Sequence, residues 1–209
     1  TVLIMKTLLR KTPHKALNKA FLKIKPNRAS IECFKKNLIT LLDSINTKEF
    51  EEHNKNLISD FLKKTYYDST NFINTKGRND LVIHNGNTAK SSVGVIIEAK
   101  SPANKMEMIS NSKLNAKSFQ ELVLYFLRER ISQKNIEIKH LIVTNVYEWF
   151  IFDAGIFEKY FSHNKNLVKE FEDFEAGRLS GNTTDLFYKE IAEPCIAEIE
   201  HNLEYTYFD

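Results

Sequence analysis

The stretch "VGVIIEAKSP", residues 93–102, decides which fold we expect for this chain of 209 residues. The run from Val93 to Ala99 is almost wholly apolar, which is typical of a buried strand, but it contains Glu98, and Lys100 follows it. Because side chains alternate across a strand, Glu98 and Lys100 lie on one face and Ala99 on the other. The pattern predicts a carboxylate and an ammonium group side by side at the end of a buried strand.

A second strand is expected just before this one. Residues 80–84 have the pattern of a strand, and the Asn-, Gly- and Ser-rich segment "NGNTAKSS" connects them to residues 93–99. In the earlier strand Asp80, Val82 and His84 share a face. If the two strands pair as a hairpin, Asp80 approaches Glu98.

Two carboxylates beside a lysine are typical of a site for a hard cation. Asp and Glu oxygens bind Mg²⁺ while several waters stay in place. The metal lowers the pKa of a bound water, and a lysine orients that water or stabilises developing negative charge. The alternative for Glu98 and Lys100 is a surface ion pair that is worth little. Asp80 and the polar connection favour the catalytic interpretation, which is phosphodiester hydrolysis.

The helix expected before the hairpin supplies a third acid. It should begin after a cap at Asn46 or Thr47. Its apolar positions, among them Ile58 and Leu62, recur at helical spacing, and Glu51 lies at the edge of that stripe. Glu51 is therefore the acid best placed to reach inward. The alternative is a carboxylate at a helix start, which the helix dipole favours.

A longer helix is expected from about residue 114 to 133. Glu121 and Tyr125 are four residues apart, so they are neighbours on its surface, and Gln120 lies beside them. These polar groups could close the site from above. The alternative is that they occupy ordinary polar positions of a helix.

The order of the elements indicates an α/β fold. Helices at 14–24 and 28–46 precede the hairpin, and two strands, in "IKHLIVTN" and "EWFIFDA", follow the central helix. Helices return at 156–174 and 184–206. We therefore predict a mixed sheet of about four strands flanked by helices, with additional N- and C-terminal helices.

Composition narrows the class of protein. No apolar run approaches the ~20 residues of a membrane span, which argues against a membrane protein. Cys33 and Cys195 are far apart and in no metal-binding pattern. Two lone thiols fit a reducing compartment, so we expect a cytoplasmic location.

The charge is unevenly distributed along the chain. The net charge is +3, but residues 1–36 alone carry +9, which leaves −6 for the rest. A basic segment suggests contact with a polyanion, and the alternative is a solvated helical face. Lys19, Lys23 and Lys25 are the candidates for holding DNA phosphates. The ten cations of this segment are Lys6, Arg10, Lys11, Lys15, Lys19, Lys23, Lys25, Arg28, Lys35 and Lys36, against the single acid Glu32.

Taken together, these motifs resemble the PD-(D/E)xK nuclease superfamily. The resemblance rests on a helix with an inward Glu, then "NDLVIHNG", "VGVIIEAK", "ELVLY" and "LIVTNVYEWFIFD", and it covers roughly residues 28–160. More narrowly, the chain looks like the N-terminal endonuclease domain of type IIG restriction-modification enzymes. In these enzymes endonuclease, methyltransferase and target recognition share one polypeptide.

The resemblance implies a role for each motif residue. Asp80 and Glu98 bind Mg²⁺ with the Ala99 carbonyl, Lys100 positions the attacking water, and Glu51 supports the metal or its waters. A family motif of Gln followed four residues later by Tyr falls on Glu121 and Tyr125. This is a departure, since Glu replaces Gln unless Gln120 has taken the role. In the "TNG..W" pattern Thr144, Asn145 and Trp149 match, and Val146 replaces Gly.

The resemblance also implies an organisation. We expect a basic helical segment at 1–46, a nuclease core at 47–175 and a C-terminal helix in 176–209 leading to a methyltransferase. No Asn-Pro-Pro-Tyr motif or Gly-rich cofactor turn is present, so we expect a fragment of a longer enzyme. S-adenosylmethionine would belong to that missing domain. The expected partner is double-stranded DNA, with a transient dimer as one route to double-strand cleavage.

Other candidates and functions stay open at this stage. Lys105, Lys113 and Lys117 could line a phosphate path, or belong to a solvated loop. His84 could contact DNA or the metal's water, although a polar position at a strand end is the simpler interpretation. The alternative functions are a freestanding repair or junction nuclease, and a catalytically silent module for DNA binding or docking.

Overall fold

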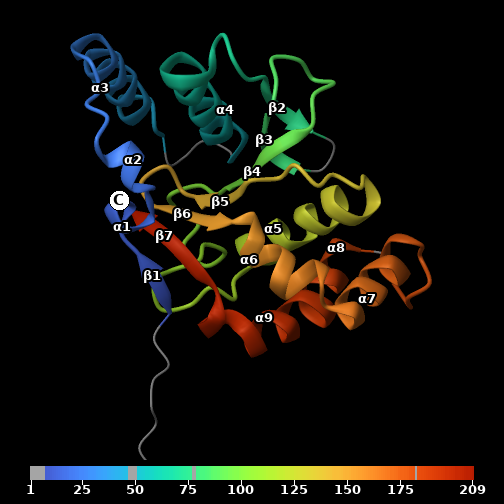
Figure 1. The fold of residues 1–209 in the computed structure, drawn as a ribbon. Coiled ribbons are helices and arrows are strands. Elements are labelled where there is room, and N and C mark those ends of the chain that lie inside the picture. Colours follow the sequence, from blue (N-terminus) through green and yellow to red (C-terminus); the bar gives the residue numbers. More distant parts are fainter. Residues whose placement is uncertain (1–7, 47–50, 77–78, 182) are drawn as a thin grey trace, which may run out of the picture.

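The computed structural model describes residues 8–46, 51–76, 79–181 and 183–209, apart from the side chains of Asn79 and Asp80. In this part of the chain a mixed sheet lies at the centre, with helices on both sides of it (Figure 1). Seven strands form it in the order β1-β7-β6-β5-β4-β3-β2. Their bounds are β1 Leu9–Lys11, β2 Ile73–Lys76, β3 Asn79–His84, β4 Val93–Ala99, β5 His140–Thr144, β6 Trp149–Asp153 and β7 Glu204–Phe208.

Helices occupy most of the remaining described chain. Several begin with the cap that their sequence provides: the Asn27 side chain accepts from the Ser30 amide before α3, and Asn164 accepts from the Leu167 amide before α7. The helices are α1 Pro13–Ala16, α2 Lys19–Leu22, α3 Arg28–Asp43, α4 Glu51–Leu62, α5 Lys117–Leu127, α6 Ala154–Phe157, α7 Lys165–Glu175, α8 Thr184–Leu186 and α9 Glu193–Ile199. Wider π-type turns follow at Lys63–Tyr67, Arg128–Ser132, Glu158–Ser162 and Phe187–Ala192, and a 3-10 turn at Glu200–Asn202.

The sheet combines antiparallel and parallel pairs. β2, β3 and β4 form an antiparallel meander, and α5 then carries the chain over to β5, which runs parallel to β4. β5, β6 and β7 are antiparallel, and β1 lies parallel to β7 at the edge. The carboxyl ends of β4 and β5 therefore meet at one edge of the sheet, where Glu98 pairs with Val143 and Ala99 with Thr144.

Two apolar cores lie on opposite faces of the sheet. Ile96 packs into the larger core, with most of α5 and the C-terminal helices. Ile97 and Ala99 pack into the smaller core, against Ile58 and Phe61 of α4. The alternation predicted for β4 is thus confirmed. It directs Glu98 toward the face that α5 covers.

The α/β class is confirmed, but the expectation of about four strands was wrong. The two hairpin strands and the two strands after the central helix are present. β1, β2 and β7 were missed. β2 has the mainly polar sequence "INTK", which lacks the alternation of a strand, and β7 begins within the stretch 184–206 that was assigned to the last helix. Both depend on neighbouring strands for their pairing, and a local pattern does not contain that information.

The helical predictions were correct in type and less accurate in extent. The stretch 14–24 forms two separate single turns, α1 and α2, and 28–46 forms α3. The predicted cap at Asn46 or Thr47 is not tested, because Thr47 lies outside the described residues and α4 begins at Glu51. None of the described helices is both long and apolar enough to cross a membrane.

Candidate active site

Two charged side chains, Glu98 in β4 and Lys100 directly after it, lie at the end of this strand, and both are buried. The side chains of Glu98 and Lys100 are 1% and 4% exposed. Lys100 follows the strand directly, and its backbone amide donates to the Thr144 carbonyl at 2.9 Å, which extends the parallel pairing by one step. The Lys100 Nζ lies 2.7 Å from Glu98 Oε1. The backbone thus fixes the lysine at the edge of the sheet.

Three further carboxylates converge on the same ammonium group. Glu121 of α5 places Oε2 2.6 Å from Lys100 Nζ. Glu51, the first residue of α4, places Oε1 at 3.3 Å. Glu107, in the segment between β4 and α5, lies at 3.9 Å and also binds Lys117 at 2.9 Å. We call these residues, with Glu98, Lys100 and Lys117, the Lys100 cluster.

The cluster strongly favours the charged form of its central lysine. Burial lowers the pKa of Lys100, but the carboxylates of Glu98 and Glu121 outweigh it and raise the pKa far above its usual range. Lys100 therefore stays an ammonium ion at neutral pH. It can donate hydrogen bonds and stabilise negative charge, but it is not a proton acceptor.

The neighbouring groups respond to the same charges. Burial raises the pKa of the Glu107 carboxyl, but hydrogen bonds from Lys117 and Asn104 outweigh it and lower the pKa below its usual value. Tyr188 lies in the turn Phe187–Ala192, which packs against α5. Its own burial, followed by the Glu121 charge, raises the pKa of its phenol to about 12. The field of the cluster therefore extends to the C-terminal helices.

The cluster holds more negative than positive charge. Glu51, Glu98, Glu107 and Glu121 contribute four carboxylates, and Lys100 and Lys117 contribute two ammonium groups, which leaves two formal negative charges. Among the side chains that the structure describes, no group of three or more His, Cys, Asp or Glu is arranged to hold a metal ion. The side chain of Asp80 lies outside that description.

The backbone of Asp80 does lie in β3. Antiparallel pairing sets Leu81 opposite Ile97, and Asp80 comes next along β3 just as Glu98 comes next along β4. The hairpin that the sequence predicted is confirmed. Whether the Asp80 carboxylate reaches Glu98 stays a prediction, because its side chain is not described.

The structure separates the two candidates for the helix motif. Glu121 contacts Lys100, whereas the Gln120 amide donates to Asn115 Oδ1 at 3.0 Å. Tyr125, one turn after Glu121, is buried. Glu121, and not Gln120, therefore joins the cluster, and it adds a carboxylate.

His84 is not available for the role in DNA or water binding that the sequence left open. It is 1% exposed, and its Nδ1 and Nε2 lie 2.6 Å from the Ser91 carbonyl and 2.9 Å from Asn74 Oδ1. Its ring also packs edge-on against Phe72. The simpler interpretation, a structural position near the end of β3, is the one that the contacts support.

The candidate phosphate-binding lysines lie in two regions. Lys105 and Lys113 are exposed between β4 and α5, the segment that contains Glu107, and Lys117 belongs to the cluster itself. Lys19 lies in α2, and Lys23 and Lys25 follow that helix, all three exposed. The first region adjoins the cluster. The second belongs to the N-terminal helices.

The turn after β5 is held in an unusual conformation beside the cluster. Val146, at the position where the family pattern has Gly, has a φ of 78°, which is rare for a β-branched residue. Its amide donates to Thr144 Oγ1 at 3.0 Å, and its carbonyl accepts from the Trp149 indole at 2.9 Å. The first bond holds the side chain of Thr144, and the second holds the turn itself. Thr144 is the residue whose carbonyl accepts from the Lys100 amide.

Sequence reasoning missed three residues at this end of the sheet. Glu107 follows no periodic pattern, and Tyr188 is 88 positions from Lys100, so neither had a local signal. Asn54 lies one turn after Glu51 on α4 and is fully buried, and neither end of its amide has a hydrogen-bond partner among the residues that the structure describes. An unpaired buried amide is costly, and a polar residue on an apolar helix face was a signal that could have found it.

Comparison with known proteins adds one match. A family model described as a domain of unknown function (DUF7149) matches residues 11–209. No curated protein and no solved structure matches the chain. The matched region contains the whole cluster and every described element that supports it.

Proposed function

This chain belongs to the family of the domain of unknown function DUF7149, and we propose that it is a magnesium-dependent DNA endonuclease domain of the PD-(D/E)xK type. One observation carries the proposal. Four carboxylates and a buried lysine, supplied by β4, α4, α5 and the segment before α5, converge at the carboxyl end of a central strand. Packing alone gives no reason to gather these charges, because burying each of them is costly.

The cluster fits a divalent cation in donor type and in charge. Magnesium prefers carboxylate and carbonyl oxygens, which Glu98 and Ala99 offer at the end of β4, and Asp80 precedes Leu81 in the paired strand. The two formal negative charges that Lys100 and Lys117 leave uncompensated match one such ion. When bound, the metal would supply a water of lowered pKa and a counter-charge for the phosphoryl group.

The chain's own residues divide the remaining work. Lys100 stays protonated, so it orients the attacking water by donating a hydrogen bond and stabilises the negative charge that develops on the phosphoryl oxygens. Glu121 and Glu51 hold the ammonium in place from two helices. Lys117, and the exposed Lys105 and Lys113, supply positive charge beside the cluster for the phosphates of the DNA strand.

The resemblance to type IIG enzymes sharpens the proposal. In that arrangement this domain would cut the DNA, while a methyltransferase that uses S-adenosylmethionine and a recognition module would belong to other parts of the polypeptide. A freestanding nuclease would use the same residues. The two are distinguished by whether methyltransferase motifs follow residue 209 in the parent reading frame.

Glu98→Gln is the sharpest test, because it removes one charge and almost no volume. We expect loss of Mg²⁺-dependent nicking of supercoiled plasmid and loss of Mn²⁺ binding measured by calorimetry. The matched control is Glu129→Gln, which neutralises another buried acid. Glu129 is not part of the cluster, and its Oε1 lies 2.8 Å from Lys76 Nζ. Unchanged nicking and Mn²⁺ binding in Glu98→Gln would refute the proposal.

A further inference from the structure

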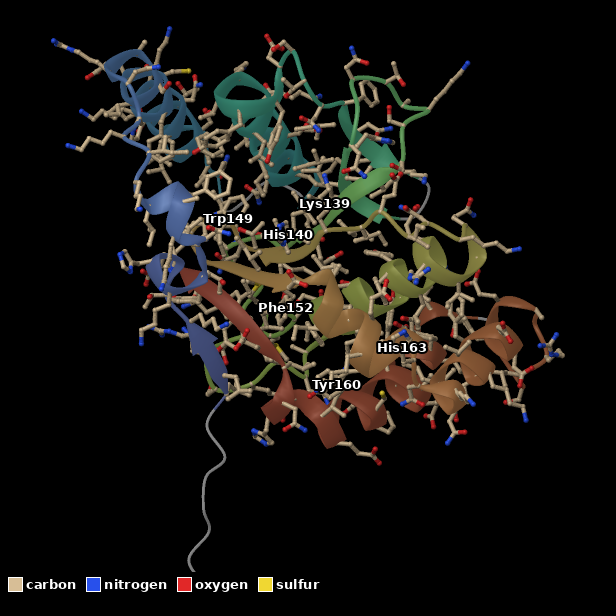
Figure 2. The ribbon with its side chains drawn as sticks, viewed as in Figure 1. Lys139, His140, Trp149, Phe152, Tyr160 and His163 are labelled. Carbon is tan, nitrogen blue, oxygen red and sulfur yellow. The ribbon has the colours of Figure 1, made fainter. Side chains whose placement is uncertain are left out.

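A groove of about 820 Å³ lies over the face of the sheet opposite α5. Its floor includes Val95 of β4, Ile142 of β5 and Ile151 of β6. All three are only partly buried, although their strands are central in the sheet. Figure 2 shows Trp149 and His140, which also line the groove, below α4 and beside the N-terminal helices.

Among the residues that the structure describes, the groove leaves part of the α/β sheet without a covering layer. Sheets with parallel pairs are normally covered on both faces, because their strands are apolar on both. On this face α4 packs Ile58 and Phe61 over β3 and β4. Over β5 and β6 the groove takes the place of the layer that α5 provides on the other face.

The N-terminal helices carry apolar side chains outward beside the groove. Leu17, at the end of α1, lines the groove and is still 51% exposed. Exposed apolar residues gathered in one segment mark an interaction site. The others on this segment are Phe21, Leu22, Ile24, Ile31, Phe34, Ile39 and Leu42.

Cations lie among these apolar side chains. Lys15, Lys19, Lys23 and Lys25 are exposed, and within the described part of the chain none of them forms an ion pair. Lys11, at the edge of the groove, is paired with Glu204 at 2.6 Å. The acids that line the groove are engaged, Glu204 with Lys11 and Asp153 with the Gly155 amide. A partner that covers this surface therefore needs apolar groups for the groove and acidic groups for the lysines of the adjoining N-terminal helices.

We propose that the groove and the N-terminal helices dock an acidic amphipathic helix of a partner protein. An apolar groove with a charged margin is the usual receptor for such a helix, which inserts its apolar side and leaves its charged side at the rim. The lysines would then pair with acids that flank the apolar stripe. This role is independent of the endonuclease proposal.

The same features disfavour the other occupants. DNA phosphates would satisfy the lysines but would leave the exposed leucine, isoleucine and phenylalanine side chains in water, so Lys19, Lys23 and Lys25 fit a protein better than DNA. A second copy of this chain offers no acidic helix of this kind in the described part: α5 to α9 contribute none of the exposed large apolar side chains. α3 does expose apolar side chains, but it carries three cations (Arg28, Lys35, Lys36) against two acids (Glu32, Asp43), so it lacks the acidic margin that the lysines require.

Trp149 makes the proposal directly measurable. It is the only tryptophan of the chain, and it lines the groove. The probe is a 21-residue peptide with Leu at helical spacing on one side and Glu on the other, without Trp. We expect a saturable change in Trp149 emission with this peptide. Two matched peptides should give none: one with Lys in place of Glu, and one with the Leu residues spread around the helix.

Variants then distinguish specific binding in the groove from nonspecific binding to exposed apolar side chains. Leu17→Asp, a half-exposed position, should weaken binding of the acidic peptide at least about tenfold, and the double charge reversal Lys15→Glu with Lys19→Glu should weaken it further. The control is Ile136→Asp, which changes an exposed apolar residue that does not line the groove. Circular dichroism melting of each variant verifies that it is folded.

Two outcomes would overturn the docking proposal. One is a Trp149 signal from duplex DNA or from anionic phospholipid vesicles with none from the acidic peptide. The other is equal binding of the acidic peptide by wild type and Leu17→Asp. Because none of these measurements involves nicking or a metal, they are distinguishable from failure of the endonuclease proposal.

Discussion

The Lys100 cluster lies at the carboxyl end of β4, the groove beside Leu17 lies on one face of the same sheet, and each contains what the other lacks. The cluster buries charged side chains that water would normally solvate. The groove and the N-terminal helices expose apolar side chains that a core would normally enclose. Scattered exposed apolar residues are ordinary, but buried charges and gathered apolar surface are not. The contrast teaches that one scaffold can carry two unusual surfaces, recognised by opposite departures from normal burial, and we propose a function for each.

Replacing Lys100 should have the largest effect on stability. Lys100→Met leaves Glu98 and Glu121 buried without their counter-charge, so the free energy of unfolding should fall by ~3–5 kcal/mol at pH 7. Mn²⁺ should recover part of the loss if the cluster binds a cation. Urea denaturation with and without Mn²⁺ measures both effects.

The control for this change is Lys76→Met, which breaks a more exposed ion pair with Glu129 and should cost less. The loss in Lys100→Met should also shrink as the pH falls, because protonated carboxyl groups no longer repel each other. A variant as stable as wild type at pH 7 would mean that the carboxylates do not depend on this ammonium group.

Asn54→Leu should make the protein more stable. The change replaces a buried amide, which has no hydrogen-bond partner in the described part of the chain, by an apolar group of similar size on the inner face of α4, so we expect a gain of ~1–3 kcal/mol in urea denaturation. If the amide serves the site, the same variant should lose nicking activity. A loss of stability would show instead that Asn54 is paired in solution, for example through a bound water.

Alkaline pH should weaken the fold through Tyr188. The pKa of its phenol is raised from 10.0 to about 12, so its contribution to stability is complete below pH 10 and is lost as the pH rises toward 12. After allowance for solvent screening, Tyr188→Phe should remove ~1–2 kcal/mol of that loss. Thermal melts at pH 9 and pH 11 test this. Tyr207, whose phenol pKa is also raised to about 12, will contribute to the remainder.

Removing an apolar side chain from the N-terminal helices should have the smallest effect. Phe21 is 63% exposed, so Phe21→Ser should change the free energy of unfolding of this chain by no more than ~0.5 kcal/mol. The same change should weaken binding of the acidic peptide. A large loss of stability would place Phe21 in the core and would end the contrast between the two surfaces.

The sequence alone predicted the parts that depend on local periodicity. Strand alternation placed Glu98 and Lys100 on one face, and the helical stripe selected Glu51, whose neighbour Glu52 lies exposed. The hairpin followed from its polar connection. Each prediction needed only the period of a strand or a helix, and that period does not depend on the rest of the molecule.

Tertiary structure alone decided the rest. β7 reads locally as a continuation of a helix, and it becomes a strand because β1 and β6 flank it. Glu107 lies beside Lys100, and Tyr188 lies within the field of Glu121, because the segment before α5 and the turn Phe187–Ala192 both pack against α5. The open groove is likewise invisible in any one segment, because every strand of its floor has the pattern of a buried strand. Burial depends on which elements cover a surface, and that is a property of the assembled layers and not of the local pattern.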